Sequence, residues 1–148
     1  MKILSILLVL IFSSCALTYQ PPIGSSKTVK ALFKNNESFD KVKRILIIDG
    51  YDLTYSNKLE GLISTAFKTK KINHLQADCG KTMGLDYLKD NRTKTEVAFT
   101  IIINEDLIEI KSKIRAEYKP TGAASQTIDL TCISKGVLEE ELLNKIKE

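Results

Sequence analysis

Three successive segments between Val97 and Cys132 alternate apolar and polar residues, and this alternation is the strongest structural signal in the chain. A period of two places the apolar side chains of a strand on one face and the polar side chains on the other. The apolar positions are Val97, Phe99, Ile101 and Ile103, then Ile108, Ile110, Ile114, Ala116 and Tyr118, then Ile128, Leu130 and Cys132. Turn residues separate the segments at 104–106 and 120–122. We therefore predict an antiparallel three-strand meander with one apolar and one charged face.

A helix is predicted from about Val137 onward. Its apolar residues recur at helical spacing, at Leu138, Leu142, Leu143 and Ile146. The acidic residues 139–141 stand near its start, and Lys145 and Lys147 stand near its end. This distribution of charge complements the helix dipole.

The chain upstream of the meander predicts a strand, a helix and a second strand. The short apolar run within Arg44–Asp49, followed by Gly50, is typical of a buried strand. Helical spacing then connects Leu59, Leu62, Ile63, Ala66 and Phe67. Residues 72–79 alternate again, with Leu75, Ala77 and Cys79 on the side expected to face the core. The predicted fold is α+β, with a βαβ opening, the meander, a C-terminal helix, and both helices on one face of a sheet.

The first fifteen residues have the layout of an export signal. Lys2 is followed by a run from Ile3 to Phe12 that is apolar except at one serine, and then by Ser13, Ser14 and Cys15. This run is shorter than the roughly 20 residues of a membrane-spanning helix. Residues 12–15 resemble the lipobox of bacterial lipoproteins, although Phe12 stands where that family usually has Leu. The resemblance implies removal of residues 1–14 and acylation of Cys15; the alternative is an ordinary cleaved signal peptide with an incidental cysteine.

The same resemblance implies an address in the cell envelope. Lipoproteins with a residue other than Asp after the cysteine usually travel to the outer membrane, and here that residue is Ala16. Several acyl chains on Cys15 would suffice for stable anchoring. Residues 15–43 are rich in Pro, Gly, Ser and Asn and predict a tether with one short helical turn, leaving 44–148 as the single domain. Loss of Lys2 lowers the formal net charge from +4 to about +3, which is too small to indicate a nucleic-acid partner.

Cys79 and Cys132 both stand at positions expected to face the core. An exported protein is oxidised outside the cytoplasm, so we predict a disulfide between them. It would close a loop of roughly 50 residues and stabilise the fold by about 4 kcal/mol on chain-entropy grounds. Two separate buried thiols that pack as small apolar groups are the alternative.

A basic row on the charged face of the meander is a candidate binding face. It consists of Lys111, Lys113 and Arg115, which could meet a phosphate-rich or carboxylate-rich envelope polymer or an envelope protein. Acidic residues share this face, at Glu109, Glu117 and Asp129. Mixed charge is also typical of a solvated sheet surface with cross-strand ion pairs.

The sequence offers one enzymatic pattern, Asp49-Gly50-Tyr51-Asp52, just beyond a predicted strand. It faintly resembles the aspartate motif of haloacid-dehalogenase-like phosphatases, in which only one residue separates the two aspartates; a turn near a helix start is the alternative. His74 is the only histidine, which excludes a multi-histidine metal site, and strand parity points it away from Cys79. There is no phosphate-binding glycine loop, nucleophile elbow or zinc-spaced cysteine pair, so no cofactor or metal is predicted.

Two classes of function follow. The first is a non-enzymatic envelope lipoprotein that binds or assembles with another envelope component. The expected order of elements loosely resembles that of lipopolysaccharide-assembly lipoproteins, but this chain lacks the Gly-Phe pair that follows their cysteine, so no binding residue is transferred. The second class is a small hydrolase or transferase that uses Asp49 and Asp52.

Overall fold

A computed structural model describes residues 19–32, 38–121 and 126–148. Its elements, in chain order, are β1 (Thr28–Leu32), α2 (Ser38–Ile48), β2 (Leu53–Asn57), β3 (Leu62–Thr65), β4 (Lys68–Thr69), β5 (Ala77–Asp78), β6 (Lys81–Thr82), β7 (Leu85–Asp86), the 3-10 helix η2 (Tyr87–Lys89), β8 (Thr93–Asn104), β9 (Leu107–Tyr118), β10 (Ile128–Thr131), β11 (Ile133–Ser134) and α3 (Val137–Lys147).

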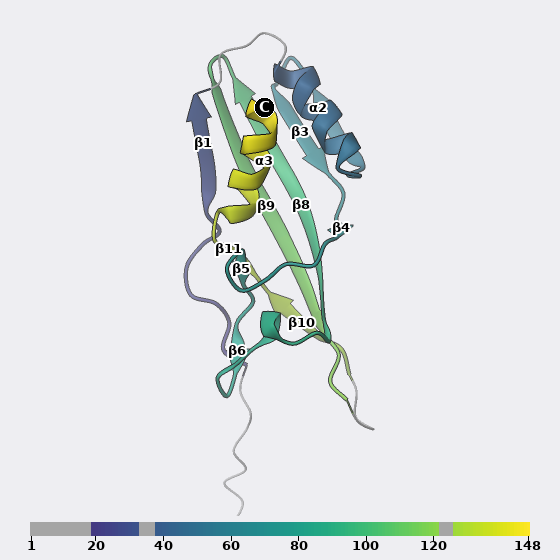
Figure 1. Cartoon of the computed structure of the whole chain (residues 1–148), viewed down its shortest axis with the longest axis vertical. Coiled ribbons are helices and arrows are strands. Elements are labelled where there is room, and N and C mark those ends of the chain that lie inside the picture. The colour runs from purple at the N-terminus through teal and green to yellow at the C-terminus, as the bar shows by residue number, and fades with distance from the viewer. Residues whose placement is uncertain (1–18, 33–37, 122–125) are drawn as a thin grey trace, which may run out of the picture.

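A long hairpin of β8 and β9 runs through the whole molecule (Figure 1). It pairs antiparallel from Thr93 opposite Tyr118 to Asn104 opposite Leu107, and it turns at Glu105 and Asp106. One edge of the hairpin pairs with β3 and β4, and the other edge pairs with β1 and β10. Every pairing is antiparallel, and the predicted meander of three strands is confirmed as β8, β9 and β10.

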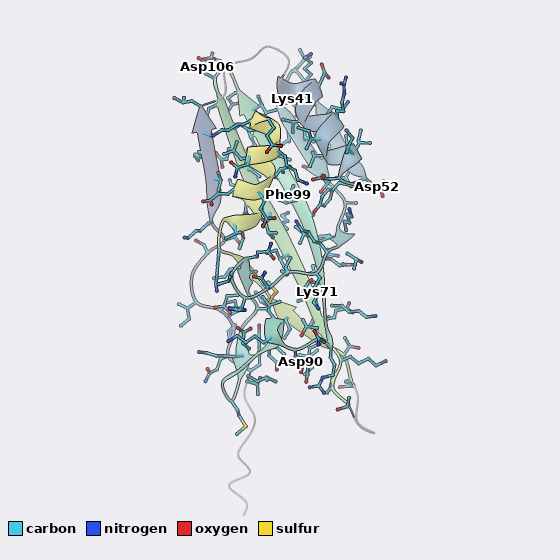
Figure 2. The ribbon with its side chains drawn as sticks, viewed as in Figure 1. Lys41, Asp52, Lys71, Asp90, Phe99 and Asp106 are labelled. Carbon is cyan, nitrogen blue, oxygen red and sulfur yellow. A yellow bond between two sulfur atoms is a disulfide. The ribbon has the colours of Figure 1, made fainter. Side chains whose placement is uncertain are left out.

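Helices α2 and α3 cover one face of the sheet, as predicted, and pack against each other (Figure 1). Apolar side chains from both helices meet those of the sheet. The fully buried members of this core are Val42, Leu46, Leu138 and Ile146 from the helices and Ile63, Ala77, Val97, Ile101, Ile108 and Ile110 from the strands, each at most 1% exposed. Phe99 lies beneath the helices in the same core (Figure 2). The α+β class with two helices on one face is thereby confirmed.

The other half of the covered face carries a second apolar core. It is covered by the segment from residue 72 to η2 rather than by a helix of the main layer. Its members are Cys79, Tyr87, Ala116, Tyr118 and Leu130, with Tyr19, Leu88 and Cys132 packed against them. Two cores thus lie side by side along one face of the β8–β9 hairpin, and none of the described elements covers the opposite face.

The strand predicted within Arg44–Asp49 is wrong, because Arg44 to Ile48 complete helix α2 and Asp49 follows it in a turn. Phe39, Val42 and Leu46 recur at helical spacing and are buried on one face of the helix, whereas Ile47 and Ile48 are exposed. Gly50 ends the helix at φ +75°. The amide of Tyr51 donates to the carbonyl of Leu46 at 2.9 Å, and that of Gly50 donates to Ile47 at 2.9 Å. These two bonds make the glycine-dependent helix ending known as the Schellman motif.

The helix predicted over Leu59–Phe67 is also wrong, since β2 and β3 form a hairpin there. The side chain of Asn57 accepts hydrogen bonds from the amides of Leu59 and Glu60, which closes a turn instead of continuing a helix. Gly61 follows at φ +63°, where a Cβ atom would lie 1.9 Å from the carbonyl oxygen of Ile103. The predicted βαβ opening is therefore replaced by a helix and an antiparallel hairpin.

Two further sequence predictions need correction. Within residues 72–79 only Ala77–Asp78 is a strand, and Leu75 is 65% exposed because it lies in a turn held by the Asn73 side chain. The predicted tether contains β1, which pairs with β9, and most of α2. The expected domain boundary at residue 43 thus falls inside a helix.

Candidate functional site

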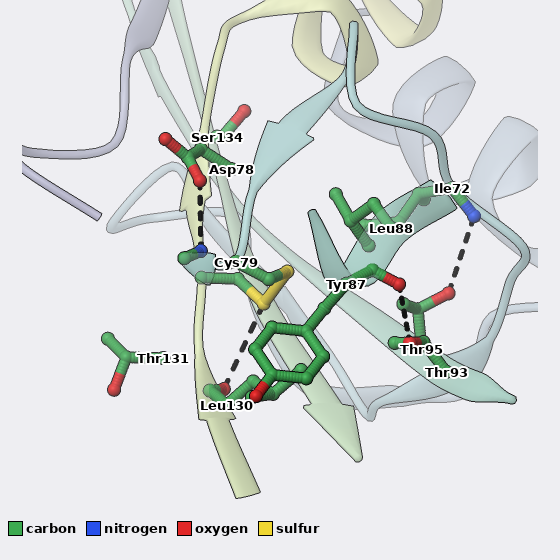
Figure 3. Close-up of a disulfide and its surroundings, with 12 residues drawn as sticks. Ile72, Asp78, Cys79, Tyr87, Leu88, Thr93, Thr95, Leu130, Thr131 and Ser134 are labelled. Atoms are coloured by element: carbon green, nitrogen blue, oxygen red, sulfur yellow. Dashed lines mark hydrogen bonds between the residues drawn. A yellow bond between two sulfur atoms is a disulfide. The ribbon is translucent and has the colours of Figure 1, made fainter. Parts of the chain in front are cut away.

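Cys79 and Cys132 form a disulfide, which confirms the predicted pair (Figure 3). Strand β5 pairs antiparallel with β11, with Ala77 opposite Ser134 and Asp78 opposite Ile133. The same register places the two cysteines opposite each other one step further along, and their Cα atoms are 4.0 Å apart. Neighbouring antiparallel strands bring facing side chains close enough to be bridged.

Aromatic rings surround the disulfide, and we call this group, with the apolar residues that pack against it, the disulfide cluster. Tyr87 lies beside the sulfur atoms (Figure 3). Its ring centroid is 4.9 Å from that of Tyr118 and 6.0 Å from that of Tyr19. Cys79 is completely buried. The bridge therefore joins β5 and β11 inside a packed core.

The N-terminal end of the described chain is attached to this cluster. The hydroxyl of Tyr19 donates to the carbonyl of Cys79 at 3.0 Å, and Gln20 and Lys81 exchange two backbone hydrogen bonds of 2.8 and 3.0 Å. Gly80, at φ +76°, permits this approach because a Cβ atom there would lie 2.4 Å from the carbonyl oxygen of Gln20. Folded structure thus begins no later than Tyr19, four residues after Cys15.

The face of the hairpin opposite the two cores is the candidate binding face, here called the open face. By alternation it presents Lys94, Glu96, Ala98, Thr100 and Ile102 from β8 and Glu109, Lys111, Lys113, Arg115 and Glu117 from β9. The predicted row of Lys111, Lys113 and Arg115 does lie together along β9. All three side chains belong to exposed residues.

The three cations of the β9 row have different surroundings. Lys111 forms an ion pair with Glu109 at 2.8 Å, and Glu109 also pairs with Lys30 of β1 at 2.9 Å. The guanidinium carbon of Arg115 lies 3.8 Å from the centroid of the Phe67 ring. Across the described ranges neither Lys113 nor Arg115 has a carboxylate within ion-pair distance. The ion pair with Glu109 therefore engages Lys111 within β9, and Lys113 and Arg115 are the two members of the row without such a pair among the described residues.

A groove of about 480 Å³ crosses the open face next to Arg115, between β4 and β10. Its charged lining consists of Lys94 and Arg115 together with Glu96, Glu117 and Asp129. The acids would repel an anion within the groove itself. Arg115 belongs to the groove lining, and Lys113 precedes it along β9 outside that lining.

A buried carboxylate that sequence reasoning missed lies on the other side of the sheet. Glu139 of α3 is completely buried. One of its oxygens accepts from the amide and hydroxyl of Ser112, at 3.0 and 2.6 Å, and the other accepts from the hydroxyl of Ser134 at 2.8 Å. The signal in the sequence was Ser112, a polar residue at a position of β9 whose neighbours of the same parity are apolar.

The two aspartates of the enzymatic hypothesis follow helix α2 instead of a strand. The carboxylate of Asp49 is engaged by Lys145 of α3 at 2.6 Å, and Lys68 donates to the Asp49 carbonyl. Asp52 is exposed near the end of α2 (Figure 2), and its carbonyl accepts from Ala66 at 2.8 Å. His74 lies in the turn before β5. Cys79, the cysteine considered as its partner, is oxidised in the disulfide.

Comparisons with known proteins match no family model and no curated protein. In the described ranges no helix is long and apolar enough to cross a membrane, and no group of three or more His, Cys, Asp or Glu side chains is placed to hold a metal ion. The predicted lipidation site, Cys15, lies outside the described residues.

Proposed function

We propose that this protein is a lipoprotein of the cell envelope, anchored by acyl chains on Cys15, whose open face binds an anionic envelope component. The export signal and the lipobox-like residues 12–15 support the anchor. The disulfide agrees with an oxidising compartment outside the cytoplasm. The outer membrane, facing the periplasm, is the proposed location because Ala16 follows the cysteine.

The proposed binding role rests on one observation: the two apolar cores cover only one face of the β8–β9 hairpin. Both apolar cores lie on the same face, so no described element covers the open face, although Ala98 near its middle is only 5% exposed. Lys113 and Arg115 stand on it two residues apart, a separation of roughly 7 Å along a strand. Two cations at this spacing match a phosphate or carboxylate group that bridges them.

Arg115 is more preorganised for anion binding than Lys113. Stacking on Phe67 restrains the guanidinium plane and leaves its N–H edges free to bind an anion in the bidentate manner. Restraint before binding reduces the entropy that is lost when a ligand is bound. We therefore expect Arg115 to contribute more to affinity than Lys113.

A charge-reversal pair tests the binding face. The double variant Lys113→Glu, Arg115→Glu reverses the charge of the row on the open face. The control variant Lys43→Glu, Arg44→Glu makes the same change of net charge on helix α2.

Crosslinking reports which partner lies on the face. A photo-crosslinking amino acid at Thr100, in the centre of the open face, would capture partners in native membranes, and Glu140 of α3 is the matched position on the covered side. We expect crosslinks from position 100 that disappear only with the first charge reversal. Crosslinks that are equal from both positions, or equally sensitive to both reversals, would contradict the proposal.

The anchor is tested separately by the mass of the mature N-terminus. We expect a chain that begins at Cys15 and carries acyl groups, and a Cys15→Ser variant that is released from membranes. An unacylated N-terminus at another residue would refute the lipoprotein assignment and leave the open-face experiment unaffected.

A further inference from the structure

Strands β6 and β7 form a small hairpin whose tip carries exposed apolar side chains. Lys81 pairs with Asp86 and Thr82 with Leu85, so that Met83 and Gly84 form a two-residue turn. Met83 is 81% exposed and Leu85 is 46% exposed. The hairpin lies at the end of the molecule opposite to the β8–β9 turn and the upper end of α2 (Figure 1).

The backbone at the tip makes methionine an unexpected residue there. Met83 has φ +49° and Gly84 has φ +79°. Two-residue hairpin turns with positive φ at both positions favour Asn, Asp or Gly at the first position. A methionine in the left-handed region is strained and, at this exposed tip, gains little from packing within the fold. Strain of this kind is a reason to look for a function of the side chain.

The β6–β7 hairpin lies close to the proposed lipid anchor. The backbone of Gln20 is bonded to that of Lys81, two residues before Met83. Cys15 precedes Gln20 by five residues, which span at most roughly 17 Å when fully extended. Acyl chains on Cys15 therefore hold this end of the molecule next to the bilayer, and the tether that would have kept the domain clear of it is short.

We propose that the tip of the β6–β7 hairpin inserts Met83 and Leu85 into the interfacial layer of the membrane that holds the acyl chains. This inference rests on the proposed acylation of Cys15. Lys81, two residues before Met83 in the hairpin, is exposed and would meet anionic lipid headgroups. The hairpin thus supplies a second membrane contact that orients the domain relative to the bilayer.

The absence of tryptophan from the chain makes this insertion measurable. A Met83→Trp variant and, as a matched control, a Leu59→Trp variant each contain a single tryptophan. Leu59 is 99% exposed in the β2–β3 turn, at the opposite end of the molecule. Both full-length proteins would be expressed in a bacterium that processes lipoproteins, checked for acylation by mass spectrometry, and reconstituted into vesicles of phosphatidylcholine and phosphatidylglycerol.

We expect the emission of Met83→Trp to shift to shorter wavelength in vesicles and to be quenched by lipids with brominated acyl chains, whereas Leu59→Trp behaves as in buffer. If the tip variant does not fold, Leu85→Trp on β7 serves the same purpose. An acylated protein whose tip tryptophan stays as water-exposed as position 59 overturns the inference and leaves the anchor standing. An N-terminus without acyl chains removes the premise and overturns both.

Discussion

The hydroxyl of Ser112 donates a 2.6 Å hydrogen bond to the completely buried carboxylate of Glu139, and so ties the middle of β9 to the first turn of α3. The helix dipole favours a negative charge in this turn. With the amide of Ser112 and the hydroxyl of Ser134, the carboxylate accepts three hydrogen bonds. Three donors and the helix terminus thus replace the water that burial removes.

Removal of this carboxylate should destabilise the protein strongly. Glu139→Ala leaves three buried donors without an acceptor, and we expect the free energy of unfolding to fall by about 3 kcal/mol. Glu139→Gln keeps one acceptor oxygen and should lose less. Urea unfolding measures both, with Glu140→Ala as the exposed neighbour that should stay within about 0.5 kcal/mol of the wild type. An equally small effect of Glu139→Ala would show that the network does not stabilise the fold.

Loss of the disulfide should also destabilise the fold. The bridge links residues separated by 53 positions, and its removal by replacing both cysteines with Ala should lower the free energy of unfolding by about 4 kcal/mol. Thermal unfolding with and without reductant provides the measurement. The double variant should be insensitive to reductant, and a wild type that is equally insensitive would argue against the bridge in solution.

Gly61 and Gly84 form a matched pair for testing close packing against backbone conformation. Both have positive φ, but a Cβ atom at Gly61 would lie 1.9 Å from the Ile103 carbonyl oxygen, whereas none of the described atoms is within 4 Å at Gly84. Gly84→Ala should therefore lose only the conformational term of about 1 to 2 kcal/mol. Gly61→Ala should lose clearly more, because β3 must separate from the end of β8. Similar losses in chemical denaturation would exclude a steric role for Gly61.

Met83→Asn should stabilise the isolated domain while weakening its contact with membranes. Asparagine tolerates the left-handed region better than methionine, so we expect a gain of about 0.5 kcal/mol in the free energy of unfolding. Glu105→Asn, at the β8–β9 turn with φ +41°, is the control because it relieves the same type of strain at the other end. Both variants should unfold at higher denaturant concentration, and only Met83→Asn should partition less into vesicles. Equal partitioning of the two would oppose membrane contact by the hairpin.

Stability at alkaline pH should depend on Tyr51. Burial, together with the nearby carboxylates of Asp49 and Glu141, raises the pKa of Tyr51 from 10.0 to about 12. The folded state therefore keeps a proton that the unfolded state loses, so this contribution is present below pH 10.0 and is lost as the pH rises toward 12. Tyr51→Phe should reduce the alkaline loss of stability. The difference in phenolate absorbance between the wild type and Tyr51→Phe should titrate near 12, and a midpoint near 10 would contradict the shift.

The sequence by itself determined the elements whose pattern is long and local. The meander and helix α3 each carry a clear repeat of apolar residues, and period two or 3.6 dictates which face is buried whatever the neighbouring elements are. The same parity directed Cys79 and Cys132 toward the core, and export made their oxidation expected. The row of Lys111, Lys113 and Arg115 was likewise predicted, because strand alternation places these three side chains together.

Only the tertiary structure decided between helix and strand at residues 45–48, since four consecutive apolar residues fit either element. Contacts of Phe39, Val42 and Leu46 with the sheet selected the helix. The adjacency of β5 and β11, on which the disulfide depends, and the contact between Ser112 and Glu139, 27 residues apart, also lie beyond periodicity. Periodicity reports which way a side chain faces along its own segment, whereas distant segments are brought together by the free energy of burying their combined surface.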